Sequence, residues 1–408
     1  MVQGNATVVL DLGNSETRGL VMFGKDANSG KYHERKFNVP NRFYKVNEDF
    51  MPSSDYSEEN STVFQINAVV DDREFCGVFC NGEVQEREFN IAPIRPTALE
   101  KKYTAQTTAL SFEVAMLYAT RALMQITRTT DYKQIDVRWN VFILLPPGDL
   151  DEGKDKMVAI IDSVKRVECA FPDVDFDINV AKTTVLPEGY CAYMGVIFDK
   201  GSIIRPKYQS LIDKITMVID IGAGTTDILI IKDKRIIRTT MNTISRGGNN
   251  VTQLVKKELR SKYGLKLNET DINRSIVTGK VQDGASEIDI VDIINSAKDN
   301  VAASLITEVK DFFEETEFPI RSIQELLVCG GGSMSSDDDE ETNANIKALS
   351  ESVVEQMKMY SKNIELVELP TTMTNVEMED GTFKKVEKRI SPRMLNLIGA
   401  SILAEGMQ

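Results

Sequence analysis

Two short segments of the chain repeat the same chemistry. Residues 11–21 (DLGNSETRGLV) align without a gap on residues 220–230 (DIGAGTTDILI), 209 positions further along. Each segment follows one apolar run and leads into another, which predicts a strand, a glycine turn and a second strand. Asp11 and Asp220 stand at the end of the first strand in each copy. The recurrence predicts a duplicated half-domain whose two copies close on one ligand.

The turns have the residue types of a phosphate-binding site. Glycine lets the backbone adopt positive φ and approach a ligand, and successive amide N–H groups in such a turn attract anions. The turn residues expected at the ligand are Gly13, Asn14, Ser15, Gly222, Gly224, Thr225 and Thr226. Asp11 and Asp220 would repel phosphate, but they can hold Mg²⁺ through its water shell. The alternative is two ordinary β-hairpins with Asp-Gly turns.

A third glycine-rich element lies further along the chain. Residues 325–329 (ELLVC) form a short run that is apolar after its first residue. Gly330, Gly331, Gly332 and Ser333 follow it. A buried strand, a glycine turn and a following helix would let the backbone approach a nucleotide. The chain contains neither G-x-G-x-x-G nor G-x-x-x-x-G-K-[ST], so the sequence supports neither a standard dinucleotide fold nor a P-loop.

Together these motifs resemble those of the actin-like ATPases, which include actin, bacterial filament proteins, heat-shock chaperone ATPase domains and sugar kinases. The order in that superfamily is phosphate hairpin, connecting helix, phosphate hairpin, adenosine-site glycines and connecting helix. The corresponding segments here are residues 11–21, 186–196, 220–230, 328–333 and 395–403. The chain length, the motif spacing and Pro187-Glu188-Gly189 are most similar to the ParM-type plasmid-segregation actins.

The resemblance implies an α/β, actin-like fold: duplicated RNase H-like lobes with a nucleotide cleft between them and smaller inserted subdomains. The first domain would comprise residues 1–190 and 391–408, with an insert at 36–104. The second would comprise residues 191–390, with a smaller subdomain at 246–320. The implied ligands are ATP and Mg²⁺.

The resemblance also implies which residues act in hydrolysis. Glu188 lies where ParM-type filaments position the attacking water, and the alternative is an acid that complements a helix N-terminus. Asp220, with Asp11 second, would organise Mg²⁺. Asp227 would orient the second turn or itself face the water.

Two further segments are implied at the base and ribose. Gly248 lies at the start of a helix that carries Lys257, a candidate contact whose alternative is a solvated helix face. Glycines 330–332 would lie against adenine or the α-phosphate, and Met334 would pack on the ring or in the core.

Composition narrows the class of partner. The 408 residues include 48 basic and 62 acidic side chains, a net charge of −14, which disfavours direct binding of nucleic acid. A DNA-binding adaptor protein would then link the chain to plasmid DNA. The chain has five cysteines and no C-x-x-C motif, which disfavours disulfides and favours a cytoplasmic protein. It has one histidine, His33, which disfavours a zinc site. No secretion signal and no apolar stretch of ~20 residues is present, so no membrane association is expected.

Apolar periodicity outlines the elements that carry these motifs. It predicts helices over residues 107–127, 154–170, 186–198, 251–263, 288–315, 345–358 and 392–405. It predicts strands over residues 137–145 and 175–181, with a hairpin over 376–386 centred on Asp380-Gly381. Residues 36–104 are polar and predicted irregular, with Cys76 and Cys80 at buried strand positions.

The function expected is an ATP-dependent filament that hydrolysis destabilises, used to segregate plasmid DNA. The first alternative is a chaperone- or reactivase-like ATPase that acts on a partner protein without polymerising. The second is a small-molecule kinase whose substrate pocket lies in the insert. The sequence does not distinguish ATP from GTP.

Overall fold

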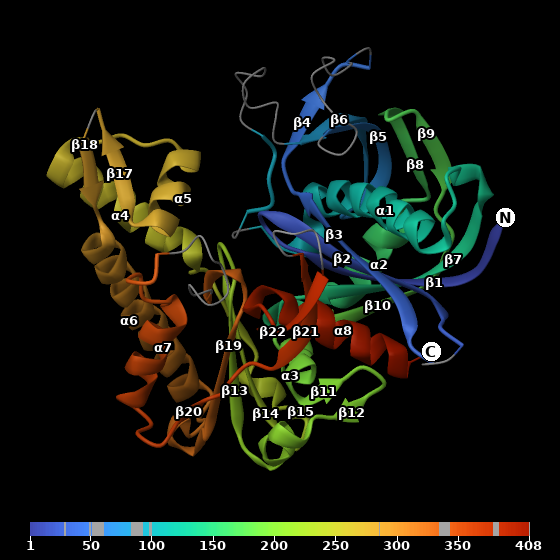
Figure 1. Ribbon diagram of the computed structural model, residues 1–408. Helices are drawn as coiled ribbons and strands as arrows, with labels where there is room; N and C mark the ends of the chain where they lie inside the picture. Colours follow the sequence, from blue (N-terminus) through green and yellow to red (C-terminus); the bar gives the residue numbers. More distant parts are fainter. Residues whose placement is uncertain are drawn as a thin grey trace. The chain divides into compact units, whose positions relative to one another are not determined.

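The computed structural model describes residues 1–27, 30–48, 50, 61–82, 93–97, 100–284, 286–333, 343–377 and 383–407. Contacts within the chain divide it into two compact units. Unit 1 comprises Met1–Glu188, Lys200–Ile203 and Ala400–Gln408, and unit 2 comprises Gly189–Asp199 and Ile204–Gly399. Each unit has a central sheet and an apolar core of its own (Figure 1).

The main sheet of unit 1 has the strand order β10-β7-β1-β2-β3. The strands are β1 (Val2–Leu12), β2 (Glu16–Lys25), β3 (Tyr32–Pro40), β7 (Ile135–Leu145) and β10 (Val180–Pro187). Strand β1 pairs antiparallel with β2 and parallel with β7. Its residues Val8, Val9 and Leu10 are fully buried, as expected for a central strand covered on both faces.

Unit 1 has a second sheet with the order β4-β6-β5-β8-β9. Its strands are β4 (Phe43–Val46), β5 (Ser61–Val70), β6 (Arg73–Gly82), β8 (Arg166–Phe171) and β9 (Val174–Asp177). Helix α1 (Gln106–Thr127) packs against strands of both sheets, and α2 (Leu150–Ser163) packs against β10 and β5. Fifteen of the 22 residues of α1 are buried, which explains why this helix is apolar around most of its circumference.

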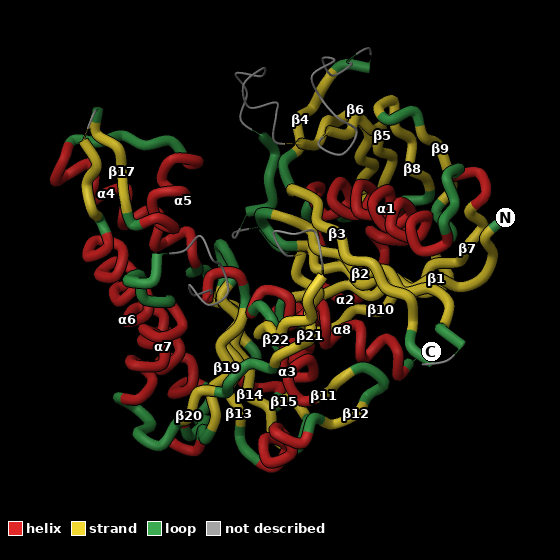
Figure 2. The backbone as a smooth tube through the Cα atoms, in the orientation of Figure 1, coloured by secondary structure: helices red, strands yellow, loops and turns green. Residues whose placement is uncertain are grey.

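The sheet of unit 2 has the order β15-β14-β13-β19-β20, and β16 pairs with β14. The strands are β13 (Thr216–Ile221), β14 (Thr226–Lys232), β15 (Arg235–Ile236), β16 (Asn242–Ile244), β19 (Glu325–Cys329) and β20 (Glu365–Leu366). Its helices are α3 (Tyr190–Ile197), α4 (Gly248–Tyr263), α5 (Glu269–Thr278), α6 (Val291–Glu315) and α7 (Leu349–Lys358). Residues of α4, α6 and α7 share one apolar core with β13, β14 and β19 (Figure 2).

The remaining elements are short or connect the units. The hairpins are β17 (Lys280–Asp283) with β18 (Ser286–Asp289) and β21 (Thr371–Glu377) with β22 (Phe383–Arg389), and β11 (Phe198–Asp199) pairs with β12 (Ile203–Ile204). Helix α8 (Leu395–Gly406) begins in unit 2 and ends in unit 1. The 3-10 helices are Lys102–Thr104, Tyr132–Gln134, Pro147–Asp149, Pro206–Asp213, Arg238–Thr240, Ile320–Ser322, Gly331–Ser333 and Pro392–Met394. No described helix has the length and apolar character needed to cross a membrane.

The two main sheets are copies of one arrangement. In each unit the first three strands of the sheet are antiparallel neighbours, and a later strand pairs in parallel with the first: β7 with β1 in unit 1, and β19 with β13 in unit 2. The hairpins also match residue by residue, because Asp11 faces Arg18 across β1 and β2, and Asp220 faces Asp227 across β13 and β14. The predicted duplication and the α/β class are confirmed.

Several predicted elements differ from the structure. The helix predicted over residues 154–170 is wrong beyond Ser163, because Val167 and Cys169 are buried in alternation with exposed neighbours in β8. The strand predicted over residues 175–181 is interrupted between β9 and β10. The prediction that residues 36–104 are irregular is also wrong, since β4, β5 and β6 lie there.

Other predictions are confirmed or shifted. Helices α1 and α4 and strand β7 lie where the periodicity placed them, whereas α5 was not predicted. Cys80 is buried on β6 as expected, but Cys76 is exposed. Met334 and the Asp380-Gly381 turn lie outside the described residues.

Candidate functional site

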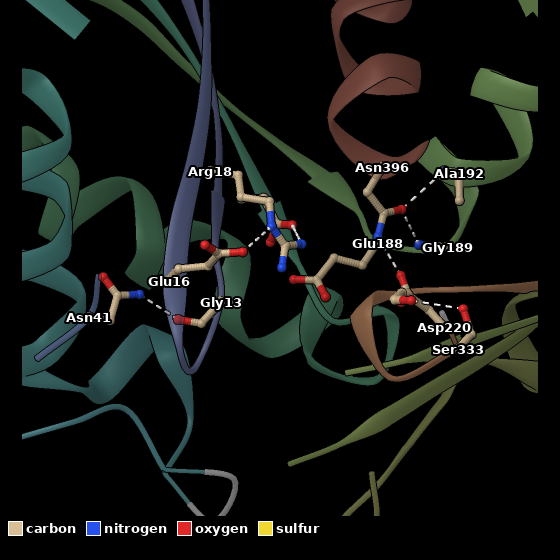
Figure 3. A network of polar contacts seen from close by, with 12 residues as sticks. Gly13, Glu16, Arg18, Asn41, Glu188, Gly189, Ala192, Asp220, Ser333 and Asn396 are labelled. Atoms are coloured by element: carbon tan, nitrogen blue, oxygen red, sulfur yellow. Dashed lines mark hydrogen bonds and ion pairs between the residues drawn. The ribbon is translucent and has the colours of Figure 1, made fainter. Parts of the chain in front are cut away.

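The first turn is held in shape by its own backbone and by a buried asparagine. Gly13 N donates to Glu16 O at 3.1 Å and closes the turn between β1 and β2. A Cβ atom at Gly13 would lie 2.7 Å from that Glu16 oxygen, so glycine is required. Asn41 donates from Nδ2 to Gly13 O at 2.5 Å and from its backbone N to Ser15 O at 3.0 Å (Figure 3). The carbonyls of this turn therefore point at Asn41.

Asn41 in turn is fixed by hydroxyl groups. It is 1% exposed, and its Oδ1 accepts from Thr17 Oγ1 at 2.9 Å and from Ser111 Oγ at 3.1 Å. The C=O and N–H of a trans peptide point in opposite directions. Because Gly13 O points at Asn41, the N–H of Asn14 points away from it, out of the turn.

The second turn has the same geometry, but different hydrogen-bond donors hold its carbonyls. We call the groups that hold the carbonyls of a turn its clamp. Gly222 N donates to Thr225 O at 2.8 Å, which is the equivalent of the bond that closes the first turn. The first amides of α4 hold its carbonyls: Gly248 N donates to Gly222 O at 3.0 Å and Asn249 N donates to Ala223 O at 2.7 Å. The start of α4 therefore supports the turn directly.

This clamp leaves two amides of the second turn directed outward. By the same trans-peptide geometry, the N–H groups of Ala223 and Gly224 point away from α4. In the described part of the chain, neither N–H donates to a protein acceptor, and both residues are half-buried. Outward amides in a turn of this kind form a concavity that binds anions. Both turns thus have the geometry that phosphate oxygens require.

The predicted hydroxyl contacts lie in different surroundings. Ser15 is exposed and Thr225 is half-buried at their turns. Thr226 is fully buried, and its Oγ1 donates to Arg246 O at 2.7 Å, so this hydroxyl fastens the hairpin to the segment before α4. Ser333 is 2% exposed, and its Oγ donates to Gly330 O at 2.8 Å.

The two aspartates that end β1 and β13 have different neighbours. Asp11 is 8% exposed, and Arg18 Nη1 lies 3.5 Å from its Oδ2, while Arg18 Nε donates to Glu16 Oε1 at 2.8 Å (Figure 3). Asp220 is 5% exposed and accepts a hydrogen bond at Oδ2 from Nδ2 of Asn396. The arginine cation beside Asp11 competes with any metal ion at that carboxylate.

Asn396 also fixes the start of α3. Its Oδ1 accepts from Gly189 N at 2.9 Å and from Ala192 N at 3.0 Å, while its Nδ2 donates to Asp220 (Figure 3). One buried amide therefore ties Asp220 to the residue that directly follows Glu188 in the chain.

Asp227 is held by a neighbouring strand. It is 4% exposed, and Thr243 Oγ1, its cross-strand partner on β16, donates to Asp227 Oδ1 at 2.6 Å. Asp227 also lies opposite Asp220 in the β13–β14 ladder.

The three glycines after β19 pack against the end of β13. Gly330 has φ of +87°, and a Cβ atom there would lie 2.3 Å from Asp220 Oδ1 and 2.4 Å from Ile221 O. A Cβ atom at Gly332 would lie 3.0 Å from Ile221 O and 3.1 Å from Gly222 O. Gly331 begins a 3-10 helix that comprises Gly331–Ser333. The glycines bring this backbone against the second turn.

Glu188 follows a strand and does not begin a helix. Leu186 and Pro187 are the last residues of β10, and α3 begins only at Tyr190, so the predicted helix start at residue 186 is wrong. Proline is tolerated there because β10 is an edge strand. Glu188 is 8% exposed, and Lys102 Nζ donates to its Oε1 at 2.6 Å.

The candidates at the base and ribose are separated along α4. Gly248 lies at the N-terminus of the helix against Gly222, with a Cβ position 3.7 Å from the Cα of Gly332. Lys257 is exposed more than two turns further on. The structure therefore joins Gly248 to the glycine turn and the second hairpin, but places Lys257 on the solvent face of α4.

Three residues of the site were not found from the sequence: Asn41, Lys102 and Asn396. Asn41 is 28 residues from Gly13, Lys102 is 86 from Glu188, and Asn396 is 176 from Asp220. Their roles depend on contacts between distant segments. The only local signal is the position of Asn396 within the segment that the family pattern marks as the last connecting helix.

The duplicated sheets, the matched hairpins and the glycine turn define the class of this protein as one with an actin-like fold. Comparison with solved structures confirms this fold across nearly the whole chain. Residues 218–339 also match the family described as archaeal actin homologue MreB-like, C-terminal.

Three solved structures illustrate what the chain is similar to. Actin-like protein Alp7A has a TM-score of 0.64 at 16% identity, covering 99% of this chain and 97% of its own. The archaeal actin homologue Ta0583 in complex with ADP has a TM-score of 0.59 at 13% identity, covering 98% and 99%. A ParM from a 15-stranded filament of Clostridium botulinum has a TM-score of 0.56 at 15% identity, covering 99% of each chain. No curated protein sequence matches the chain. The predicted resemblance to the actin-like superfamily is confirmed, with ParM proteins among the similar structures.

Proposed function

We propose that this chain binds and hydrolyses ATP and that nucleotide state controls its assembly into filaments. The observation that carries the proposal is the pair of clamped turns, each with amides directed outward. The clamps, Asn41 in one turn and the first amides of α4 in the other, preorganise these donors before any ligand arrives. Preorganised donors stabilise phosphate charge without a reorganisation cost during the reaction.

The residues fit the nucleotide and its metal ion. At Gly330 and Gly332 the backbone packs so closely against the second turn that a side chain would not fit. A backbone without side chains at these positions can approach a nucleotide closely. Asp220, buried and oriented by Asn396, would hold Mg²⁺ through its water shell, with Asp11 as the weaker candidate. When bound, Mg²⁺ neutralises charge on the phosphates.

Glu188 would orient the attacking water. Lys102 donates a hydrogen bond to Oε1 of the buried Glu188 carboxylate, which fixes the orientation of the group. In phosphoryl transfer the protein mainly positions the nucleophile and stabilises charge, so one oriented carboxylate is sufficient for this role. Asp227 would hold the second hairpin in place beside Asp220.

Filament assembly is proposed from the fold and the similar structures. One similar structure is that of a ParM filament, and another is a complex with ADP. We propose that this chain likewise polymerises with itself and moves plasmid DNA through a DNA-binding adaptor in the cytoplasm. The net charge of −14 favours an adaptor over direct contact with DNA.

The test follows light scattering and pelleting of the purified protein with Mg²⁺ and ATP, ADP or GTP. ATP should trigger scattering that decays as it is hydrolysed. Glu188→Gln should bind ATP and assemble, but its hydrolysis rate should fall by about 10²-fold or more, so that scattering persists. Glu74→Gln, an exposed carboxylate on β6, is the matched control and should behave as the wild type.

Other results would contradict parts of the proposal. If ATP binds but no polymer forms under any nucleotide, the chain is a partner-dependent ATPase and the filament proposal fails. If ADP forms only when a metabolite is added, and the γ-phosphoryl group is found on that metabolite and not as free phosphate, the chain is a kinase. If Glu188→Gln hydrolyses ATP at the wild-type rate, another residue orients the water.

A further inference from the structure

Unit 1 carries a basic groove that shares no residue with the turns described above. It has a volume of about 760 Å³ and is lined by Arg35, Lys36, Phe37, Tyr118, Arg121, Ala122, Met124, Gln125, Arg128, Thr129, Thr130 and Tyr132. Four of these residues are basic and none is acidic, in a chain whose net charge is −14. Its lining residues come from β3, from the C-terminal part of α1 and from the segment that follows α1. Strand β3 and helix α1 are labelled in Figure 1.

Three of the four basic residues of the groove are arginines. Arg35 and Arg128 are exposed, and Arg121 is half-buried with its guanidinium 5.2 Å from the ring centroid of Tyr118 and its Nε donating to Tyr132 at 3.0 Å. Arg35 shares one face of β3 with Phe37, because residues two apart in a strand point the same way. Guanidinium groups bind carboxylates through paired hydrogen bonds, which favours an acidic ligand.

The aromatic rings of the groove are already packed. Phe37 stacks on Tyr118 with ring centroids 6.4 Å apart, and Tyr132 stacks on Phe176 at 5.6 Å. Arg121 lies over the same Tyr118 ring. Single-stranded nucleic acids bind on aromatic faces that are available for stacking. These rings instead present edges and apolar area to a ligand, which suits aliphatic side chains better than bases.

The groove also borders the edge of a sheet. Strand β3 ends the order β10-β7-β1-β2-β3, so within the described residues one of its edges pairs with no strand. An extended peptide can add to such an edge through its main chain while its side chains enter neighbouring pockets. Alternate residues along the nine-residue strand β3 direct their backbone N–H and C=O groups to this edge.

We infer that this groove docks an extended, acidic peptide segment of a partner protein, with carboxylates facing Arg35, Arg121 and Arg128 and aliphatic side chains against Phe37 and Tyr118. This surface lies wholly within unit 1 and needs no nucleotide. It therefore adds a partner site to the proposed function and is tested independently of it.

The experiment measures fluorescence anisotropy of a labelled twelve-residue peptide of alternating Glu and Leu, without nucleotide. The wild type should bind it, more weakly as salt rises. Arg35→Glu with Arg128→Glu should weaken binding at least about tenfold. Arg73→Glu with Arg138→Glu, two exposed arginines of unit 1 outside the groove, makes the same change in charge and should keep wild-type affinity.

Each other outcome overturns the inference. No binding by the wild type, or equal losses in the two double variants, shows that the groove is not a peptide site. Tighter binding of a twelve-nucleotide single-stranded DNA than of the peptide would assign the groove to nucleic acid. Sedimentation that shows the groove variants, but not the control variants, losing self-association without nucleotide would assign it to a second copy of this chain.

Discussion

At the residue scale, Asn41 and the first amides of α4 perform the same task in the two copies of the hairpin. Both donate hydrogen bonds to the carbonyls of the turn. The amide N–H groups of the turn therefore point in the opposite direction. Asn396 adds a link of a different kind, because one amide group binds Asp220 and the start of α3. Asn41 and Asn396 each bind several partners, and together these contacts hold the backbone of the proposed site in place.

Gly330→Ala should be strongly destabilising. The new Cβ would meet Asp220 Oδ1 and Ile221 O, and φ at this position is +87°. Gly264→Ala is the matched control, because Gly264 has φ of +69° but open space around its Cβ position. The control should lose about 1 kcal/mol of unfolding free energy, and Gly330→Ala about 3 kcal/mol or more, in urea denaturation. Equal losses would mean that the glycine turn does not pack against Asp220.

The residues that were found from the sequence are those whose role is local. Asp220 and Gly222 stand out because a strand end and a tight turn leave their signature within a few positions. Lys102 and Asn396 leave none, because they reach their partners only after distant segments have packed. For the proposed site, the loops could be predicted, whereas the side chains that orient them could not.

At the scale of elements, α1 carries a carboxyl group in the core of unit 1. Glu113 is 1% exposed, and burial raises its pKa well above the ordinary value of 4.5, with the nearby Glu168 carboxylate raising it further. The pKa is thus higher in the folded than in the unfolded chain. The contribution of Glu113 to the unfolding free energy should therefore be fully present below about pH 4.5 and be lost as the pH rises through the folded pKa.

Glu113→Gln should remove this pH dependence. The variant has no proton to lose, so its stability relative to the wild type should rise by about 1.4 kcal/mol per pH unit through that window. Urea unfolding from pH 4.5 to 8 measures the difference in unfolding free energy between the variant and the wild type. The control is Glu74→Gln, at an exposed position, and its difference from the wild type should not change with pH. A constant difference between Glu113→Gln and wild type would show that Glu113 titrates normally.

Elements were predicted well where one periodicity prevails. Helix α1 and strand β7 have continuous apolar patterns, whereas β8 follows α2 so closely that its two buried residues, Val167 and Cys169, extend the helical pattern by chance. Pro187 was misleading for another reason. Proline suits both the first turn of a helix and an edge strand, and only the pairing of β10 with β7 decides between them.

At the scale of the molecule, the duplication was visible because the hairpins kept both their register and their glycines. The matched strand order of the two sheets follows from it, since each first strand accepts a parallel partner on its other side. The second sheet of unit 1 has no counterpart motif in the sequence. Its strands β4, β5 and β8 were missed, whereas β9 overlaps the strand predicted over residues 175–181 and β6 carries Cys76 and Cys80. The domain boundaries inferred from the resemblance stay a prediction.

The net charge of −14 should make assembly dependent on salt. Copies of an acidic chain repel one another, and the screening length shortens from about 30 Å at 0.01 M to about 8 Å at 0.15 M salt. The critical concentration for ATP-dependent pelleting should therefore fall several-fold over that range. Arg73→Glu with Arg138→Glu makes the net charge more negative by four and should steepen the dependence, while sucrose at matched osmolarity should not reproduce it. A critical concentration that rises with salt would mean that ion pairs between copies outweigh their overall repulsion.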